Sequence, residues 1–212
     1  MKGYFIVIEG CEGAGKSTAC ATVKDYFLNL GYKDEDIILT REPGGTEISE
    51  KIRKILKEDH QEKMCSKTEL LLMYAARNQL VESIIKPSIE QGKIVIGDRH
   101  DLSSIAYQGA GRGIDRTLID DIRKIVLGDF RPNLTLVLDL PPEVGLGRAQ
   151  RRGELDRFEK ENIDFFNRIR NCFLEEAKKD PEKILVIDAS KDLETVTKSI
   201  NQVLKDKICK AG

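Results

Sequence analysis

The stretch YFIVIEGCEGAGKST, residues 4–18, decides the fold of this chain. Residues 4–8, YFIVI, form an apolar run with β-branched side chains, which predicts a strand buried on both faces. Residues 10–17, GCEGAGKS, follow closely and have the spacing G-x-x-x-x-G-K-S. This spacing is typical of a phosphate-binding loop between a strand and a helix, although a chance glycine-rich turn could also produce it. The helical pattern that begins at Lys16 favours the phosphate-binding loop.

The rest of the chain repeats this alternation of apolar runs and helical patterns. Alternating strands and helices form a parallel sheet with helices on both faces. We therefore expect an α/β fold of the P-loop NTPase type, with three layers and a five-stranded parallel sheet. Strands are expected at residues 4–8, 37–40, 94–96, 134–138 and 184–187, and helices at 16–30, 46–57, 68–85, 115–127, 159–178 and 193–207.

Two local features should interrupt this pattern. Pro87 should end or kink the helix that begins near Thr68, because proline has no backbone N–H and clashes with the preceding turn. Gly109, Gly111 and Gly113 follow no strand, so they predict a turn before the next helix and not a dinucleotide-binding fingerprint.

Length and composition limit the class of protein. The 212 residues suffice for one domain with a sizeable core, so a single domain over residues 1–212 is expected. The 35 lysines and arginines balance 36 acidic residues, which argues against a nucleic-acid partner. No apolar run approaches the roughly 20 residues that span a bilayer, and no secretory signal is recognisable. We expect a cytoplasmic protein with no membrane partner, whose five cysteines are reduced thiols.

The predicted phosphate loop assigns a task to each of its residues. Its glycines allow backbone N–H groups to converge on phosphate oxygens, Lys16 adds a positive charge, and Ser17 can bind Mg²⁺. The chain has only two histidines, too few for a histidine-rich metal centre, so any metal is expected to come with the substrate. The ATP-binding residues would be Gly10, Gly13, Ala14, Gly15, Lys16, Ser17 and Thr18.

A carboxylate at the end of another strand should complete the Mg²⁺ site. Asp98 and Asp139 both follow apolar strands. We favour Asp98, because Arg99 comes next and would place a phosphate-binding guanidinium beside the metal ligand. Asp139 is the alternative.

Glu12 lies inside this loop, where its carboxylate should repel phosphate. A hydroxyl of a second substrate could donate a hydrogen bond to Glu12 and thereby lie beside the donor phosphates. The alternative is a solvent-exposed glutamate without a role.

Arg148, Arg151 and Arg152 share one face of a predicted helix. Like charges at this spacing destabilise a helix by about 0.2–0.5 kcal/mol per pair, so a polyanionic ligand would relieve them. The polar residues that follow predict a mobile lid at about residues 147–160, which would close over bound nucleotide. A solvated helix end is the alternative.

Two other arginines indicate ligand contacts. Arg77 lies in an apolar helical stripe, where an unpaired guanidinium would be costly. Either a carboxylate pairs with it, or the stripe borders a cavity in which it meets a polar ligand. Arg41 ends the second strand, at the edge where α/β sheets bind ligands.

With these segments identified, the chain closely resembles bacterial thymidylate kinases, which phosphorylate dTMP with ATP. The resemblance runs from near Tyr4 to near Asp188. Its most specific motifs are GCEGAGKS at residues 10–17, TREPGGT at 40–46, YAAR at 74–77, GDRHDLSSIAYQGAGRGID at 97–115, GDFRPNLTLVLDL at 128–140 and RGELDRFE at 152–159.

The resemblance implies specific roles. Glu12 would lie near the sugar 3′-hydroxyl, Arg41 and Arg99 would bind the acceptor phosphate, and Arg77 would hydrogen-bond the thymine edge. The implied substrate-binding residues are Glu12, Arg41, Met73, Arg77, Arg99, Ser104, Tyr107 and Gln108, and the implied catalytic residues are Glu12, Lys16, Arg99, Arg148 and Arg152. The resemblance also implies a homodimer.

One residue departs from this pattern. The family usually has a phenylalanine one helical turn before the base-reading arginine, whereas this chain has Met73. Methionine can contact an aromatic base through sulfur but has no flat ring.

Two rival functions remain open: a kinase for another nucleoside monophosphate, or a nucleotide-dependent switch protein. The chain has no Asn-Lys-x-Asp guanine-recognition sequence, and its arginines require a second anionic ligand, which argues against the switch.

Overall fold

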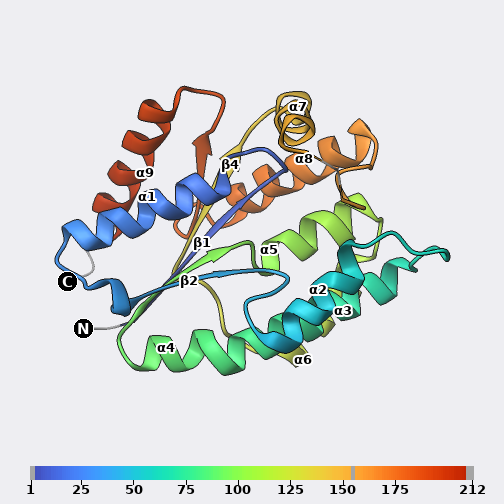
Figure 1. Cartoon of the computed structure of the whole chain (residues 1–212), viewed down its shortest axis with the longest axis horizontal. Helices are drawn as coiled ribbons and strands as arrows, with labels where there is room; N and C mark the ends of the chain where they lie inside the picture. Colours follow the sequence, from blue (N-terminus) through green and yellow to red (C-terminus); the bar gives the residue numbers. More distant parts are fainter. Residues whose placement is uncertain (1–2, 154–155, 209–212) are drawn as a thin grey trace.

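The computed structural model describes residues 3–153 and 156–208 and contains a five-stranded parallel sheet (Figure 1). Its order is β2-β3-β1-β4-β5. Because parallel neighbours need crossover connections, helices lie between successive strands. The α/β class and all five predicted strand positions are confirmed. The strands are β1 (Tyr4–Gly10), β2 (Ile37–Arg41), β3 (Ile94–Asp98), β4 (Leu134–Asp139) and β5 (Ile184–Asp188).

Strand burial follows position in the sheet. In the central strand β1, every residue after Tyr4 is buried. The edge strands β2 and β5 are only partly buried, and Leu39 and Val186 are 50% and 44% exposed. The prediction that all five runs are buried on both faces is therefore wrong for the edges, which have a neighbouring strand on one side only.

Helices cover both faces of the sheet and pack on alternate residues of β1. On one face, α1 (Lys16–Asn29) and α9 (Leu193–Ile208) lie side by side, and they share a core with Ile6 and Ile8 (Figure 1). On the other face, α3 (Ser66–Leu80) and α6 (Arg116–Leu127) form a core with Phe5 and Val7. Helix α8 (Ile163–Lys179) extends that layer over β4 and β5. The three predicted layers are present.

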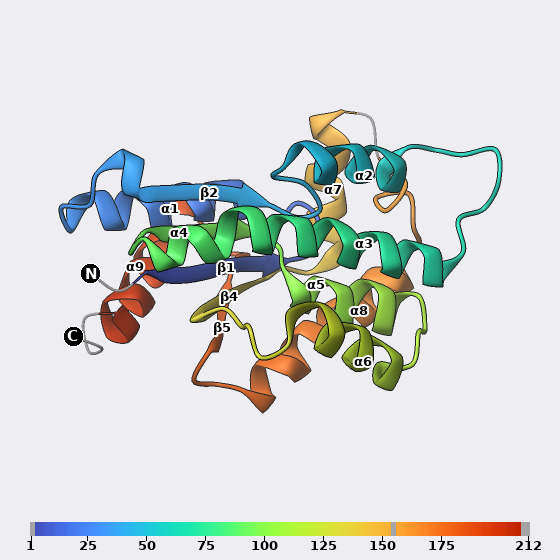
Figure 2. The same ribbon diagram turned by 90° about the horizontal axis from the view of Figure 1, so that it is seen from below.

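Pro87 interrupts its helix without ending it. Helix α3 runs into a π-helical turn, η2 (Val81–Ile85), and then into α4 (Lys86–Glu90), which contains Pro87 (Figure 2). Proline is tolerated in the first turn of a helix, and a π turn is a known site where the regular hydrogen-bond ladder changes. The predicted interruption therefore takes the form of a π turn.

The segment around Gly109 and Gly111 is helical, so the predicted turn is wrong there. Helix α5 (Asp101–Ser104) continues as a π helix, η3 (Ile105–Gly111). A Cβ atom at Gly111 would lie 2.6 Å from the Phe165 ring, so this glycine allows α8 to approach closely. Close helix packing explains Gly111, whereas Gly113, with a φ of 75°, lies in the turn that follows, as predicted.

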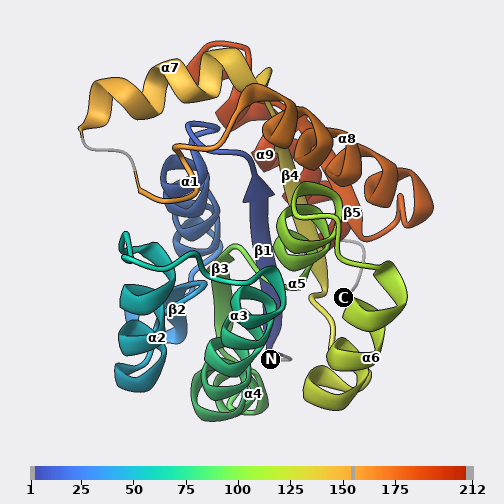
Figure 3. The same cartoon turned by 90° about the vertical axis from the view of Figure 1, so that its right-hand side faces the viewer.

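Two further helices lie beyond the carboxyl ends of the strands. Helix α2 (Glu47–Lys57) begins at Thr46, whose side chain accepts a hydrogen bond from the Ser49 N–H. Helix α7 (Pro142–Arg152) lies past the tip of the β1 arrow in Figure 3. Within the described residues, no helix combines the length and apolarity needed to cross a membrane.

Candidate active site

The phosphate loop joins β1 to α1 at the carboxyl edge of the sheet. Gly10, Gly13 and Gly15 have φ values of 140°, 69° and 88°, which other residues rarely adopt. The Lys16 ammonium donates hydrogen bonds to the carbonyl oxygens of Gly10 (3.2 Å) and Cys11 (2.8 Å). Burial lowers the pKa of Lys16, and the nearby Arg99 charge lowers it further. The loop therefore has the predicted position and shape.

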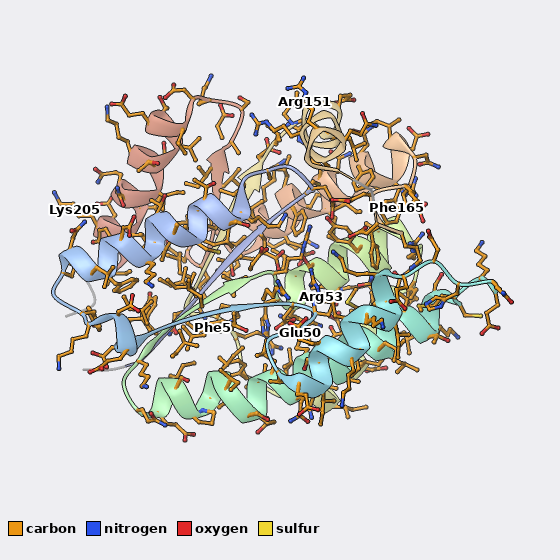
Figure 4. All side chains as sticks on the ribbon, in the orientation of Figure 1. Phe5, Glu50, Arg53, Arg151, Phe165 and Lys205 are labelled. Carbon is orange, nitrogen blue, oxygen red and sulfur yellow. The ribbon has the colours of Figure 1, made fainter. Side chains whose placement is uncertain are left out.

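Helix α7 packs tightly against this loop. A Cβ atom at Gly13 would lie 2.1 Å from the Gly145 carbonyl oxygen, so a larger residue there would displace α7 or the loop. Arg148 donates a hydrogen bond to the Gly13 carbonyl oxygen at 3.3 Å. The predicted lid arginine Arg148 is thus beside the phosphate loop. Arg151 is exposed at the outer side of α7 (Figure 4), whereas the Arg152 side chain and residues 154–155 of the predicted lid are outside the described part.

Glu12 does not point into solvent. One carboxylate oxygen accepts a hydrogen bond from Arg99 at 2.8 Å, and the other accepts one from the Tyr107 hydroxyl at 2.7 Å. The Arg99 guanidinium also lies over the Tyr107 ring, 4.8 Å from its centroid. Arg99 therefore neutralises the carboxylate that seemed out of place in an anion-binding loop.

Asp98 and Asp139 have different surroundings. Arg170 binds both oxygens of Asp139, at 2.7 and 3.0 Å. By contrast, Asp98 Oδ1 is buried and has no hydrogen-bond partner. A buried carboxylate oxygen without a partner is costly unless a cation or donor reaches it. The free oxygen of Asp98 fits a hard cation such as Mg²⁺, while Asp139 is already used in an ion pair.

One cavity brings together most of the predicted site residues. It lies between the phosphate loop, the end of β3, α2, α3 and η3. Gly10, Ala14, Gly15, Ser17, Thr18 and Arg148 do not line it. The predicted residues that do are Glu12, Gly13, Lys16, Arg41, Met73, Arg77, Asp98, Arg99, Ser104, Tyr107 and Gln108.

Arg77 both pairs with a carboxylate and borders a cavity, the two possibilities that the sequence left open. Its guanidinium is 2% exposed, and it donates to Glu42 at 2.7 Å and to the His100 carbonyl oxygen at 3.0 Å. Its NH1 atom has no hydrogen-bond partner and lies 3.8 Å from Asp101 Oδ1, and the side chain borders the cavity. Ser104 Oγ, also buried at the cavity, has no partner either. These two polar atoms are suited to the edge of a base.

A buried ion-pair network supports Arg77 from behind. Glu42 also accepts a hydrogen bond from His100 Nδ1 at 2.6 Å, and Asp101 accepts one from Tyr74 at 2.7 Å. The Arg77 charge holds the pKa values of Glu42 and Asp101 below their ordinary values of 4.5 and 3.8, against the opposing effect of burial. These carboxylates therefore favour the folded state when they are ionised.

We expect the free energy of unfolding to fall as pH decreases below about 4.5, because Glu42 takes up a proton at a higher pH in the unfolded chain than in the folded chain. Glu42→Gln should reduce this dependence and cost about 3–5 kcal/mol at pH 7, because Arg77 loses its buried partner. Urea unfolding at several pH values measures both effects, with exposed Glu62→Gln as the control. An unchanged pH dependence in Glu42→Gln would contradict this assignment.

Comparison with known proteins identifies the family of the chain that carries this site. A family model described as thymidylate kinase matches residues 8–200. The chain belongs to the thymidylate kinase family. It is therefore a nucleoside monophosphate kinase, a phosphotransferase.

Relatives of the thymidylate kinase family match the chain over nearly its whole length. The chain is 53% identical to a thymidylate kinase of Vibrio parahaemolyticus over 207 residues, which is 97% of each chain. It is 52% identical to one of Photobacterium profundum over 205 residues, 96% of this chain and 97% of the relative. A crystal structure of thymidylate kinase from Ehrlichia chaffeensis has a TM-score of 0.80 at 33% identity, covering 96% of this chain and all of that one.

The cavity of this thymidylate kinase family member contains residues that sequence reasoning missed. Arg53, on α2 (Figure 4), donates to the Pro43 carbonyl oxygen at 2.6 Å and lines the cavity. The sequence signal that could have identified Arg53 is its place on the helix that Thr46 caps, seven residues after that cap and shortly after Arg41. Phe158 lines the cavity too, from the second half of the predicted lid at residues 147–160. That segment is held by a Lys57–Asp156 ion pair of 2.7 Å.

Proposed function

We propose that this chain transfers the γ-phosphoryl group of ATP to dTMP, giving dTDP and ADP in dTTP synthesis. The position of Arg99 is the observation that carries this proposal. Its side chain donates to the phosphate-loop carbonyl oxygen of Gly10 at 3.0 Å and also lines the cavity that holds Arg77 and Ser104. A guanidinium placed between a phosphate loop and a second polar cavity suits transfer between two bound nucleotides.

The proposed mechanism consists of positioning and charge neutralisation. The phosphate loop and Lys16 would hold the ATP phosphates, while Arg99 and Arg41 would hold the acceptor phosphate, with Arg53 beside them. The acceptor oxygen would then attack the γ-phosphorus in line, and the bond between that phosphorus and the β–γ bridging oxygen would break, so that the bridging oxygen leaves with ADP. The acceptor phosphate is already largely ionised near neutral pH, so no general base is needed.

The cavity would read the base and the sugar of dTMP. Arg77 NH1 and Ser104 Oγ would hydrogen-bond the edge of thymine, with Gln108 beside them and Met73 against its face. Glu12 and Tyr107 would lie next to the deoxyribose. Each Glu12 oxygen keeps a lone pair beyond its hydrogen bond to Arg99 or Tyr107, so it could still accept from the 3′-hydroxyl.

The lid arginines would complete the site for the donor nucleotide. Arg148 already contacts the backbone of the phosphate loop. We propose that Arg148 and Arg152 stabilise the charge on the transferring group when a mobile segment at residues 147–160 closes over ATP. The rest of the chain would form one domain around this site.

Mg²⁺ bound with ATP would be held by Ser17 and Asp98. Ser17 is exposed at the first turn of α1, and Asp98 Oδ1 is without a partner. When bound, the ion would neutralise charge on the β- and γ-phosphates.

Asp98→Asn should raise the Mg²⁺ concentration needed for half-maximal rate and lower kcat by about 10- to 100-fold, because asparagine is neutral. Asp139→Asn is the matched control, since it removes a strand-end carboxylate that Arg170 already binds. Rates measured across a Mg²⁺ titration distinguish the two variants. If Asp139→Asn has the larger Mg²⁺ effect, the assignment is reversed.

ADP release with ATP, Mg²⁺ and a panel of dTMP, dUMP, UMP and AMP tests the proposed function directly. Fast turnover of dTMP, with dUMP slower, supports it. Met73, which stands where the family usually has a flat ring, favours one rival, a kinase for another nucleoside monophosphate. Such a kinase would turn over the other monophosphate as fast as dTMP or faster. No transfer to any acceptor would support a switch protein instead.

We also propose that the chain forms a homodimer and acts in the cytoplasm. Leu71 on α3 and Ile125 on α6 are 56% and 84% exposed, and these two helices are neighbours. Large exposed apolar side chains are typical of interaction surfaces when they lie close together. Sedimentation velocity tests the oligomeric state.

A further inference from the structure

Glu9 is a buried carboxylate that the mechanism above does not use. It lies on β1, directly before the phosphate loop, and is 0% exposed. Its Oε1 atom accepts hydrogen bonds from the backbone N–H groups of His100 (2.8 Å) and Ser103 (3.1 Å), and Oε2 accepts one from the Ser103 hydroxyl at 2.6 Å. Burial raises the pKa of Glu9, and the nearby Arg99 charge lowers it. Glu9 therefore fixes the segment that follows Arg99.

Ser103 connects Glu9 to the Arg99 side chain. Arg99 NH1 donates a hydrogen bond to Ser103 Oγ at 3.2 Å. A hydroxyl has a single hydrogen, and Ser103 donates it to Glu9, so the oxygen presents only lone pairs to the guanidinium. Glu9 thus sets the direction of the hydroxyl that receives Arg99.

The backbone conformation of Arg99 provides a second way in which Glu9 positions this residue. Within the described residues, Arg99 is the only non-glycine residue with a positive φ, 70°. Such a conformation is costly for an arginine and persists only where its surroundings enforce it. The hydrogen bond that the backbone N–H of the next residue, His100, donates to the Glu9 carboxylate is part of that enforcement.

We propose that Glu9 is a positioning residue for the acceptor phosphate, acting through Ser103 and Arg99 without touching the substrate. The inference rests on the proposed role of Arg99 in phosphate binding. The competing role for Glu9 is a general one, in which it only stabilises the start of α5. Loss of that support would also displace Tyr107 and Gln108, which lie further along the same helical segment.

Comparison of dTMP with thymidine separates these two roles, because thymidine has the same base and sugar but no phosphate. The dissociation constants of both ligands can be measured by titration calorimetry for the wild type, Glu9→Gln, Ser103→Ala, Arg99→Ala and the Glu9→Gln/Arg99→Ala double variant. Glu9→Gln preserves size. If its amide oxygen keeps the backbone donors, its NH₂ faces Ser103 and turns the hydroxyl hydrogen toward Arg99.

Glu9→Gln and Ser103→Ala should each weaken dTMP binding about tenfold, the effect of a lost hydrogen bond to a charged group, and change thymidine binding less than about twofold. In the Arg99→Ala background, Glu9→Gln should have almost no further effect on dTMP, because residues that act through one another are not additive. Ser103→Ala carries the test alone if Glu9→Gln does not fold.

Equal weakening of dTMP and thymidine, or a full additional loss in the double variant, would overturn the proposal and leave Glu9 with the general stabilising role. A wild type that does not bind dTMP would contradict the proposed function itself, which is a separate result. Glu176→Gln is the control: Glu176 is a buried carboxylate whose partners, Arg116 and Lys179, lie outside the site. It should leave both affinities unchanged.

Discussion

Replacing Lys16 by alanine should lower kcat/KM by about three orders of magnitude or more while the chain still folds. The Lys16 ammonium has three N–H donors, and two of them bind the carbonyl oxygens of Gly10 and Cys11. These bonds hold the charge at the centre of the loop, and the third donor remains for a phosphate oxygen. A thousandfold loss corresponds to about 4 kcal/mol of transition-state stabilisation.

Steady-state rates with saturating dTMP and varied ATP measure this effect. Lys16→Met retains the aliphatic stem without the charge, so it separates electrostatics from packing. Lys24→Ala, on the outer part of the same helix, is the matched control and should leave the rate unchanged, since Lys24 pairs with Asp34 away from the site. Near wild-type activity of Lys16→Met would refute the proposed role of the charge.

The sequence was sufficient for the parts of the structure that local patterns determine. The five apolar runs became the five strands, and residues 10–17 formed the phosphate loop between β1 and α1. Both follow from short-range rules: strand burial requires continuous apolar residues, and the loop requires glycines at fixed spacing. Glycine itself was the weaker signal, because Gly111 allows close helix packing and does not form a turn.

The sequence could not identify pairs of residues that are distant along the chain. Arg77 and Glu42 are 35 positions apart and form a buried ion pair. Asp139 and Arg170 are 31 apart, and that pair leaves Asp98 as the carboxylate with a free oxygen. Glu12 likewise needed Arg99, 87 positions later, to explain its charge. In each case the residue type was informative, but the partner depended on which strand and helix ends the fold brings together.

Arg99→Ala should lower kcat/KM for dTMP by about a thousandfold, because it removes the guanidinium placed between the phosphate loop and the cavity. Alanine has a Cβ atom like arginine, so the cost of the positive φ at this position remains and the backbone gains no new freedom. Arg99→Lys keeps the charge but not the planar fork that binds Gly10, Ser103 and Glu12. It should therefore lose an intermediate factor of about a hundred.

The distribution of the loss between the two substrates decides whether Arg99 has the proposed role. If it binds the acceptor phosphate, Arg99→Ala weakens dTMP binding and lowers kcat, whereas the affinity for ATP alone changes little. Arg116→Ala, which removes a surface arginine paired with Asp120 and Glu176, should change neither. A selective loss of ATP affinity in Arg99→Ala would instead assign this guanidinium to the donor phosphates. Arg41 and Arg53 would then have to hold the acceptor phosphate without it.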